Sequence, residues 1–256
     1  MNELDLDRVR QFVNTHIDEF HRRRIGKLQR LNLRDLLRRK NPYLFRAKNI
    51  VTANELIEGL LDASLSSSEE EMFGQFLEDL AIFVAETTCG GRKSAAPGVD
   101  LELIRDNTHY VISIKSGTSW GNSSQHKRLA QDLQDAVVRL KQSRTTSRSV
   151  QSILGICYGR TKTVYTPQGY LKVVGQNFWS LIGGNKELYI EIVEPLGYRA
   201  KEHNEMFLSG RSEIVNKFTG EFIQSFCEPS GAIDWRRVVE FNSKNFDLDE
   251  FGIISS

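Results

Sequence analysis

The sequence predicts an α/β fold, in which a mixed sheet of about five strands is flanked by helices, with a helical N-terminal region and a helical C-terminal half. Three observations support this prediction. Apolar and polar residues alternate over 99–103 and 110–115, as in strands with one buried face. Residues 149–158 form a largely apolar stretch, which is typical of a buried central strand. Apolar residues recur at helical spacing on both sides of these strands, for example over residues 4–23.

Helices are expected to occupy most of the chain before residue 90. Their expected ranges are 4–23, 31–40, 54–65 and a fourth from Ser68 to before Cys89. The second helix must end before Asn41-Pro42, since the residue before a proline disfavours the helical conformation. The fourth begins at Ser68 because Ser68 and Glu71 have the spacing of a capping box.

Strands and helices alternate after residue 90. Asp106 and Asn107 fit a hairpin turn that joins the first two strands. The remaining expected elements are a helix over 123–142, strands over 149–158 and 163–165, helical segments over 168–181, 187–194, 201–226 and 234–241, and a tail over 246–256. Phe178, Trp179 and Tyr189 are expected in the core.

Charge is distributed unevenly along a chain whose net charge is only +1. Residues 1–50 hold 13 Lys or Arg against 6 Asp or Glu, whereas residues 51–90 hold 9 acidic side chains and no basic one. Clustered cations such as Arg38, Arg39 and Lys40 suit contacts to DNA phosphates. The alternative is a solvated helix face.

Cysteine usage and hydropathy restrict the class of protein. Cys89, Cys157 and Cys227 are odd in number and widely spaced, which argues against a disulfide framework or a zinc site. No apolar run approaches the roughly 20 residues that span a bilayer. The acidic first residues are unlike a signal peptide, so we expect a cytoplasmic protein.

Acidic and basic side chains should meet across the predicted hairpin. Asp100 and Glu102 share one face of the first strand, and the turn would set Asp100 near Ser113 and Lys115. A carboxylate oxygen suits magnesium, and a cation suits an attacked phosphate. The arrangement therefore predicts a metal-dependent phosphodiesterase site. The alternative for Asp100 and Lys115 is a salt bridge at the strand end.

A second metal-binding carboxylate must come from elsewhere, because Ser113 is neutral. Glu78 lies on the helix that leads into the Asp100 strand and would point toward the same pocket, unless it is a surface glutamate. Glu102 is displaced from Asp100 by roughly 6.5 Å along the strand. Asp132 lies on the helix that follows. The order of preference is Glu78, Glu102 and Asp132, and Ser113 would hold a metal-bound water.

Gly98-Val99-Asp100 followed by Ser113-Ile114-Lys115 resembles the PD-(D/E)xK nuclease signature, with Ser113 in place of the usual acid. Together with residues 66–78, 115–125 and 175–179, the signature makes the chain similar to type II restriction endonucleases that cut interrupted RGGNCCY-like sites. The likeness covers most of residues 30–210. It implies a restriction-endonuclease-like core and Mg²⁺-dependent hydrolysis of double-stranded DNA that leaves a 5′-phosphate and a 3′-hydroxyl.

The resemblance also implies roles for individual residues. Asp100, a helix carboxylate such as Glu78 and the Ile114 carbonyl would hold the ion, and Lys115 would orient or deprotonate the attacking water. The polar segment that follows would contact DNA, because its amides, hydroxyls and cations can bind base edges and phosphates. Its candidate residues are Ser116, Trp120, Asn122, Ser123, Ser124, Gln125, Lys127 and Arg128. The alternative is a turn with a helix cap.

The expected organisation is a helical basic extension over 1–50 and an endonuclease domain over 51–256 with a helical C-terminal part. A palindromic site favours a homodimer, and the resemblance implies a companion DNA methyltransferase. Two other functions stay open, namely a structure-specific repair or recombination nuclease of the same fold and a catalytically inactive DNA-binding module. The second follows from the missing acid at Ser113.

Overall fold

The computed structural model describes residues 3–142 and 149–245, and the chain divides into two compact units. The first, here called the sheet unit, comprises Met1–Phe20 and Glu71–Ala200. The second, the helical unit, comprises His21–Glu70 and Lys201–Ser256. The expected division into residues 1–50 and 51–256 stays a prediction, because compactness does not say which parts fold independently.

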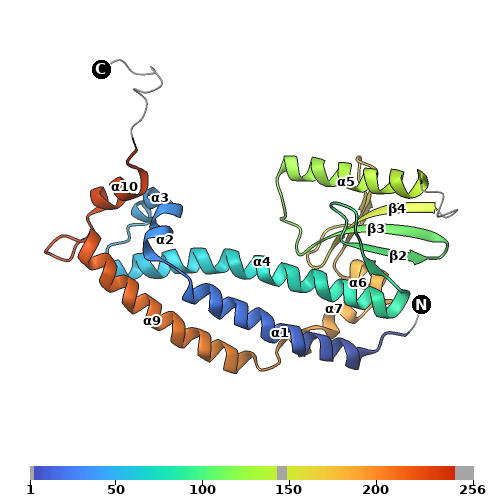
Figure 1. Ribbon diagram of the computed structural model, residues 1–256, viewed down its shortest axis with the longest axis horizontal. Helices are drawn as coiled ribbons and strands as arrows, with labels where there is room; N and C mark the ends of the chain where they lie inside the picture. Colours follow the sequence, from blue (N-terminus) through green and yellow to red (C-terminus); the bar gives the residue numbers. More distant parts are fainter. Residues whose placement is uncertain (1–2, 143–148, 246–256) are drawn as a thin grey trace, which may run out of the picture. The chain divides into compact units, whose positions relative to one another are not determined.

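The sheet unit is built on six strands in the order β1-β2-β3-β4-β6-β5. Figure 1 shows β2, β3 and β4 of this sheet next to one another. The strands are β1 Arg92–Lys93, β2 Leu101–Arg105, β3 Thr108–Lys115, β4 Ser149–Ile156, β5 Val164–Tyr165 and β6 Leu171–Val174. The pairs β1–β2, β2–β3 and β5–β6 are antiparallel, whereas β3–β4 and β4–β6 are parallel. The predicted mixed α/β fold is therefore confirmed, with six strands instead of about five.

The hairpin at Asp106 and Asn107 is confirmed. Both residues have positive φ, at 46° and 59°, as a two-residue turn of the hairpin type requires. The turn sets Arg105 opposite Thr108 and Leu101 opposite Ile112. This register fixes which residues face each other at the far end of the pair.

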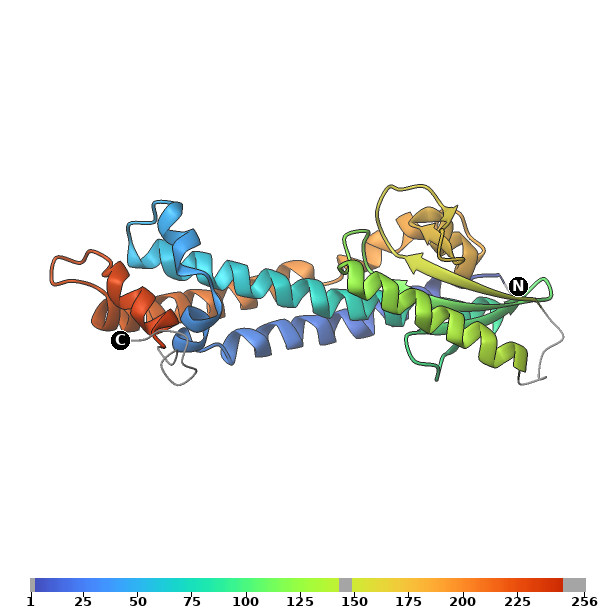
Figure 2. The ribbon, with the colours of Figure 1, turned by 90° about the horizontal axis from the view of Figure 1, so that it is seen from above.

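Helices cover both faces of the sheet. Ile112 and Ile114 of β3 are buried in one cluster with α1 (Leu6–Gln29), α4 (Ala53–Cys89) and α6 (Gln176–Gly183). Val111 is buried on the opposite face against α5 (Ser123–Gln142), which crosses the strands in Figure 2. The alternation of side chains along β3 thus serves two separate cores.

Two expectations about helix boundaries are wrong. Residues 53–89 form one helix of 37 residues, so no helix begins at Ser68. The hydroxyl of Ser68 instead donates to the carbonyl of Ser64, one turn earlier, which lets a serine-rich run continue the helix while Leu65 and Met72 stay buried. Residues 171–174, expected to be helical, form β6 because they pair with β4.

The helical unit contains α2 (Leu33–Arg39), α3 (Pro42–Ala47), α9 (Ala200–Phe226) and α10 (Trp235–Ser243) with parts of α1 and α4. The helices expected over 31–40, 201–226 and 234–241 are confirmed. The short helix α3 was not expected, although Asn41 caps it and Pro42 occupies its first turn. The expected tail over 246–256 lies outside the described residues.

The expected aromatic core is confirmed for Phe178 and Trp179, which are buried, and is wrong for Tyr189. Tyr189 is 38% exposed because the short helix α7 (Leu188–Glu191) turns only Leu188 inward. A further short helix, α8 (Val193–Leu196), follows. Within the described ranges, none of the helices combines the length and apolar character that crossing a bilayer requires.

Candidate active site

Asp100 lies immediately before β2 and its carboxylate reaches across to β3. Asp100 Oδ2 accepts hydrogen bonds from the backbone N–H of Ile114 at 2.6 Å and from Ser113 Oγ at 3.1 Å. Its own backbone N–H donates to the Ile112 carbonyl at 2.9 Å. These bonds fix the carboxylate and leave its other oxygen, Oδ1, without a donor among the described residues.

Lys115 ends β3 on the same side of the hairpin. Its Nζ lies 3.8 Å from Asp100 Oδ2 and donates to the Ile114 carbonyl at 2.8 Å and to Ser113 Oγ at 3.4 Å. The ammonium also stands 5.7 Å from the centre of the Trp120 ring. The structure therefore brings together Asp100, Ser113 and Lys115, as the hairpin geometry predicts.

The carbonyl of Ile114 points toward the same place. Asp100 and Ile112 pair through the backbone, so the polar backbone groups of residues 112 and 114 share the edge of β3 that faces β2. Ile114 lies beyond Leu101, the first residue of β2, so no backbone of β2 pairs with it there. Its N–H donates to the Asp100 carboxylate instead, and its carbonyl accepts from Lys115 Nζ.

Glu78 on α4 is a half-buried carboxylate near this cluster. Burial raises the pKa of Glu78, and the negative charge of Asp100 raises it further, while Lys93 and Lys115 lower it. No hydrogen bond or ion pair joins its carboxylate to the described residues. One turn earlier, a Cβ added at Gly74 would lie 3.5 Å from Ser116 Oγ, so this part of α4 packs against the residue that follows Lys115.

Glu102 shares the hairpin but is occupied by its own partners. Its carboxylate accepts from Ser94 Oγ at 2.7 Å, from Arg92 Nη2 at 3.0 Å and bonds His109 Nε2 at 3.1 Å. Burial would raise the pKa of Glu102, but these donors together lower it below its ordinary value. His109 is buried and is a partner of this carboxylate.

Asp132 on α5 lies against the turn that precedes Asp100. A Cβ added at Gly98 would come within 2.4 Å of Asp132 Oδ2, and Gly98 has a φ of +71°. Arg128 Nε stands 3.9 Å from the same oxygen. Asp132 therefore packs on the backbone of the Asp100 segment.

Among residues 3–142 and 149–245, no group of three or more histidine, cysteine or acidic side chains could hold a metal ion. The cluster around Asp100 differs from such a group because it combines two carboxylates with one backbone carbonyl. It has the free Asp100 Oδ1, the Ile114 carbonyl and, on α4, the carboxylate of Glu78.

The loop after Lys115 leads into the cap of α5. Asn122 Oδ1 accepts from the backbone N–H groups of Ser124 and Gln125, both at 3.1 Å, and Gln125 Oε1 accepts from the Asn122 N–H at 2.8 Å. In this structure the side chains of Asn122 and Gln125 therefore form a helix cap, as the alternative interpretation of this segment predicts. Trp120 packs on His126, with ring centres 4.2 Å apart.

The remaining DNA-contact candidates are spread over both units. Ser123, Ser124, Lys127 and Arg128 are exposed in the first turns of α5. Ser116 is half-buried. Arg38, Arg39 and Lys40 lie in the helical unit at the end of α2, where Arg38 Nη1 is 3.9 Å from Asp35 and Lys40 Nζ donates to the Ala63 carbonyl at 2.8 Å.

Two features of the site were missed from the sequence. The charge of Lys93 lowers the pKa of Glu78, because the short strand β1 pairs with β2 and holds Lys93 within electrostatic reach. No local sequence pattern predicts this pairing. Gly74 permits the approach of Ser116, and a helical glycine one turn before a candidate acid was the available signal.

A mixed sheet that carries Asp100 before one strand and Lys115 at the end of the next has the arrangement of the PD-(D/E)xK nuclease signature, with Ser113 in place of its second acid. The model of the family described as type II restriction endonuclease EcoO109I matches residues 7–204, and the chain belongs to this family of enzymes. EcoO109I recognises RGGNCCY. A search of curated proteins found no match to the chain. The resemblance stated from the sequence is thus confirmed at the level of the family.

Proposed function

We propose that this protein cuts double-stranded DNA at a specific sequence by hydrolysing phosphodiester bonds, with a divalent metal, to leave a 5′-phosphate and a 3′-hydroxyl. The observation that carries the proposal is the pair of Asp100 Oδ2 and Lys115 Nζ, 3.8 Å apart at the end of a hairpin. Membership of the type II restriction endonuclease family supports it.

The residues present fit a magnesium ion. Mg²⁺ usually takes one or two carboxylates and completes its shell with water and substrate phosphate. Among residues 3–142 and 149–245, Asp100 Oδ1 has no donor and the half-buried carboxylate of Glu78 has no partner, and the Ile114 carbonyl lies at the same strand end. When bound there, the ion would polarise the phosphate and lower the pKa of water.

Each protein group then has a defined task. Asp100 is held in one orientation by the Ile114 N–H and by Ser113 Oγ. Lys115 supplies a positive charge next to that carboxylate, where it would offset the charge that grows on the phosphate and orient the attacking water. We assign Ser113 to positioning Asp100, since its hydroxyl proton points at Asp100 Oδ2.

The second carboxylate is assigned to Glu78. Burial and the charge of Asp100 raise the pKa of Glu78, and no described residue pairs with its carboxylate, so a bound cation would stabilise its ionised form. Glu102 is a weaker candidate because Arg92, Ser94 and His109 already satisfy it. Asp132 is weaker as well, since it packs on Gly98 beside Arg128.

Recognition of DNA is assigned to the loop and the first turns of α5. Trp120, Ser123, Ser124, Lys127 and Arg128 offer stacking surface, hydroxyls and cations. Asn122 and Gln125 keep their amide N–H₂ groups available while their oxygens cap the helix. A site such as RGGNCCY is nearly two-fold symmetric, which favours a homodimer with one active site per strand.

A companion methyltransferase that protects the same site would share the cytoplasm with this enzyme. This pairing is part of the proposal, since an enzyme that cuts a short sequence would otherwise cut the DNA of its own cell.

Digestion of an unmethylated plasmid in Mg²⁺, followed by sequencing of the ends, tests the proposal. Discrete fragments with one common end sequence are expected. A structure-specific nuclease would give no discrete fragments from relaxed duplex DNA. An inactive DNA-binding module, favoured by Ser113, would give no cleavage at any enzyme concentration, and Ser113→Glu would then restore cutting.

A further inference from the structure

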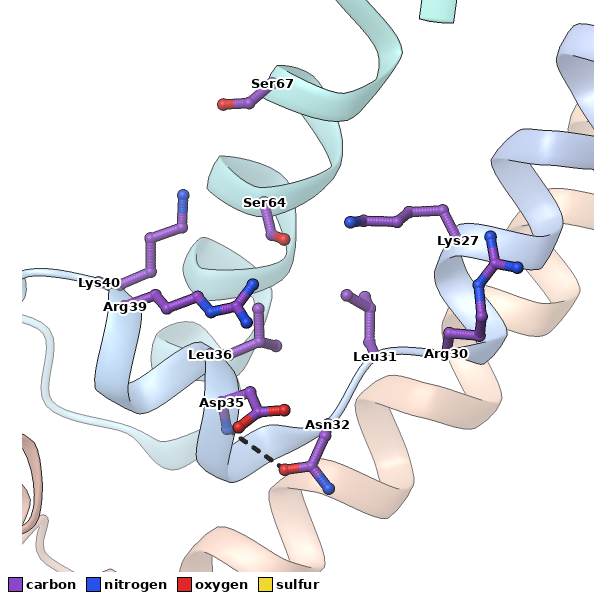
Figure 3. A pocket seen from close by; sticks show the side chains of 10 residues that line it. All are labelled: Lys27, Arg30, Leu31, Asn32, Asp35, Leu36, Arg39, Lys40, Ser64 and Ser67. Carbon is purple, nitrogen blue, oxygen red and sulfur yellow. Dashed lines mark hydrogen bonds between the residues drawn. The ribbon is translucent and has the colours of Figure 1, made fainter. Parts of the chain in front are cut away.

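A cavity of about 430 Å³ lies within the helical unit, between α1, α2 and α4 (Figure 3). Four cationic side chains and two hydroxyls line it, together with the apolar Leu31 and Leu36. These polar lining residues are Lys27, Arg30, Arg39, Lys40, Ser64 and Ser67. The lining comes from α1, α2, α4 and the residues that flank α2, which distinguishes a concave site from the solvated face of a single helix.

The cations of this cavity are not neutralised by acidic side chains. Among the described lining residues Asp35 is the one acid, and its Oδ1 stands 3.9 Å from Arg38 Nη1, which does not line the cavity. No carboxylate of the described residues forms an ion pair with Lys27, Arg30 or Arg39. Lys40 donates to the carbonyl of Ala63. Four cations against one acid leave an excess of positive charge, so a bound anion would stabilise the arrangement.

The orientation of the side chains supports a ligand in the middle of the cavity. Figure 3 shows Lys27 on α1 and Arg39 on α2 extending from opposite sides toward Ser64 on α4. The Ser64 hydroxyl makes no hydrogen bond with the described residues, whereas Ser67 Oγ donates to the Ala63 carbonyl at 3.3 Å. Two cations and one free hydroxyl therefore converge on the same space.

We propose that this cavity binds a phosphate group. Arginine, lysine and serine donors are the groups that recognise phosphate oxygens. The volume of about 430 Å³ exceeds what one tetrahedral anion fills, so the cavity has room for a longer ligand that carries the phosphate. That ligand is a DNA backbone or a free polyphosphate such as that of a nucleotide. Binding of a DNA backbone rests on the proposed function, whereas binding of a free polyphosphate does not.

The test uses two matched double variants of the full chain. Lys27→Gln/Arg39→Gln removes one lysine and one arginine from the cavity. Arg23→Gln/Lys217→Gln removes the same charges from exposed positions of the helical unit that do not line it. Any general effect of lowering the net charge by two is therefore common to both variants.

Two ligands separate the possible sources. Binding of inorganic tripolyphosphate is measured by calorimetry, and binding of a short non-cognate duplex is measured by fluorescence anisotropy across a range of salt concentrations, without metal. For the ligand that the cavity takes, we expect Lys27→Gln/Arg39→Gln to weaken affinity about ten-fold or more, since two charge-assisted contacts are lost. For duplex DNA the slope of log affinity against log salt should also fall by up to about 2. The control should stay within about two-fold.

A third variant reads the same site through stability. Ser67→Asp places a carboxylate in the cavity. It should raise the melting temperature and weaken phosphate binding, because it adds a negative charge among the cations. Ser66→Asp, one residue away on an exposed position of α4 that does not line the cavity, is its control.

Loss of duplex binding in the cavity variants assigns the DNA backbone, and loss of tripolyphosphate binding alone assigns a free polyphosphate. Equal behaviour of cavity and control variants with both ligands would overturn the proposal. These measurements involve no cleavage, so they are independent of whether Asp100 and Lys115 hydrolyse DNA.

Discussion

The negative charge of Asp100 raises the pKa of Glu78, so the two carboxylates lie within electrostatic reach although one precedes a strand and the other lies on a helix. Burial of Glu78 is the larger cause of the rise. Two acids held close together are unfavourable when both are ionised, and Lys93 and Lys115 offset only part of this effect on the pKa of Glu78. A site prepared for a cation has this property.

Glu78→Gln should therefore stabilise the metal-free protein at neutral pH while removing activity. A carboxyl whose pKa is higher in the folded state than its ordinary value of 4.5 destabilises the fold once it ionises, so the gain should be present at neutral pH and vanish below that value. Melting temperatures of both proteins across pH test this. Mg²⁺ should raise the melting temperature of the wild type more than that of Glu78→Gln. If Mg²⁺ raised both melting temperatures equally, the second metal ligand would be Glu102 or Asp132 instead of Glu78.

Asp100→Ala and Lys115→Ala should each lower cleavage by at least about two to three orders of magnitude, the scale of a removed charge-stabilising group. Sequence-specific binding in Ca²⁺ or in metal-free buffer should persist, because both side chains act on the reacting phosphate. Gel shift and single-turnover cleavage on one duplex separate the two effects. Lys162→Ala, which removes an exposed lysine of the same unit, is the control. Binding that falls in step with cleavage would contradict the assigned roles.

The catalytic hairpin was predictable because its signals are local. Asp106 and Asn107 determine the turn, and the turn determines that Asp100 faces Ser113. The preference for Glu78 over Glu102 also came from the sequence. The physical reason for this preference could not be predicted. Arg92 and Glu102 are ten residues apart in the sequence, and Arg92 bonds Glu102 only because β1 pairs with β2.

Elements that depend on distant partners were not predictable in the same way. Residues 171–174 form β6 only because β4 offers them a parallel edge. The serine-rich run around Ser68 resembles a helix start, but its hydroxyls bond back to the preceding turn and its buried neighbours continue the helix. The cavity between α1, α2 and α4 is lined by residues of three helices and of the segments that flank α2. The charge distribution along the sequence identified its cations as a cluster but could not show that they line one cavity.

Ser113 should prove a positioning residue and not a relic of lost activity. It is buried, and its hydroxyl donates to the oxygen of Asp100 that the Ile114 N–H also holds. Ser113→Ala should lower the single-turnover rate about ten-fold, on the scale of a lost hydrogen bond to a charged group, with little change in DNA binding. Ser113→Thr keeps the donor and should recover most of the rate. Full activity of Ser113→Ala would show that Asp100 needs no such support.

Gly98 lies two residues before Asp100, in a backbone conformation that favours glycine. Its φ of +71° disfavours any side chain, and a Cβ there would come within 2.4 Å of Asp132 Oδ2 on α5. Gly98→Ala should therefore cost about 1–3 kcal/mol in unfolding free energy and displace Asp100 enough to slow cleavage. Gly90→Ala separates the two causes, because Gly90 has a similar φ of +64° with no atom within 4 Å of its added Cβ. Chemical denaturation should give a larger loss for Gly98→Ala than for Gly90→Ala. Equal losses would mean that backbone strain alone acts and that the contact with Asp132 does not restrain the Asp100 segment.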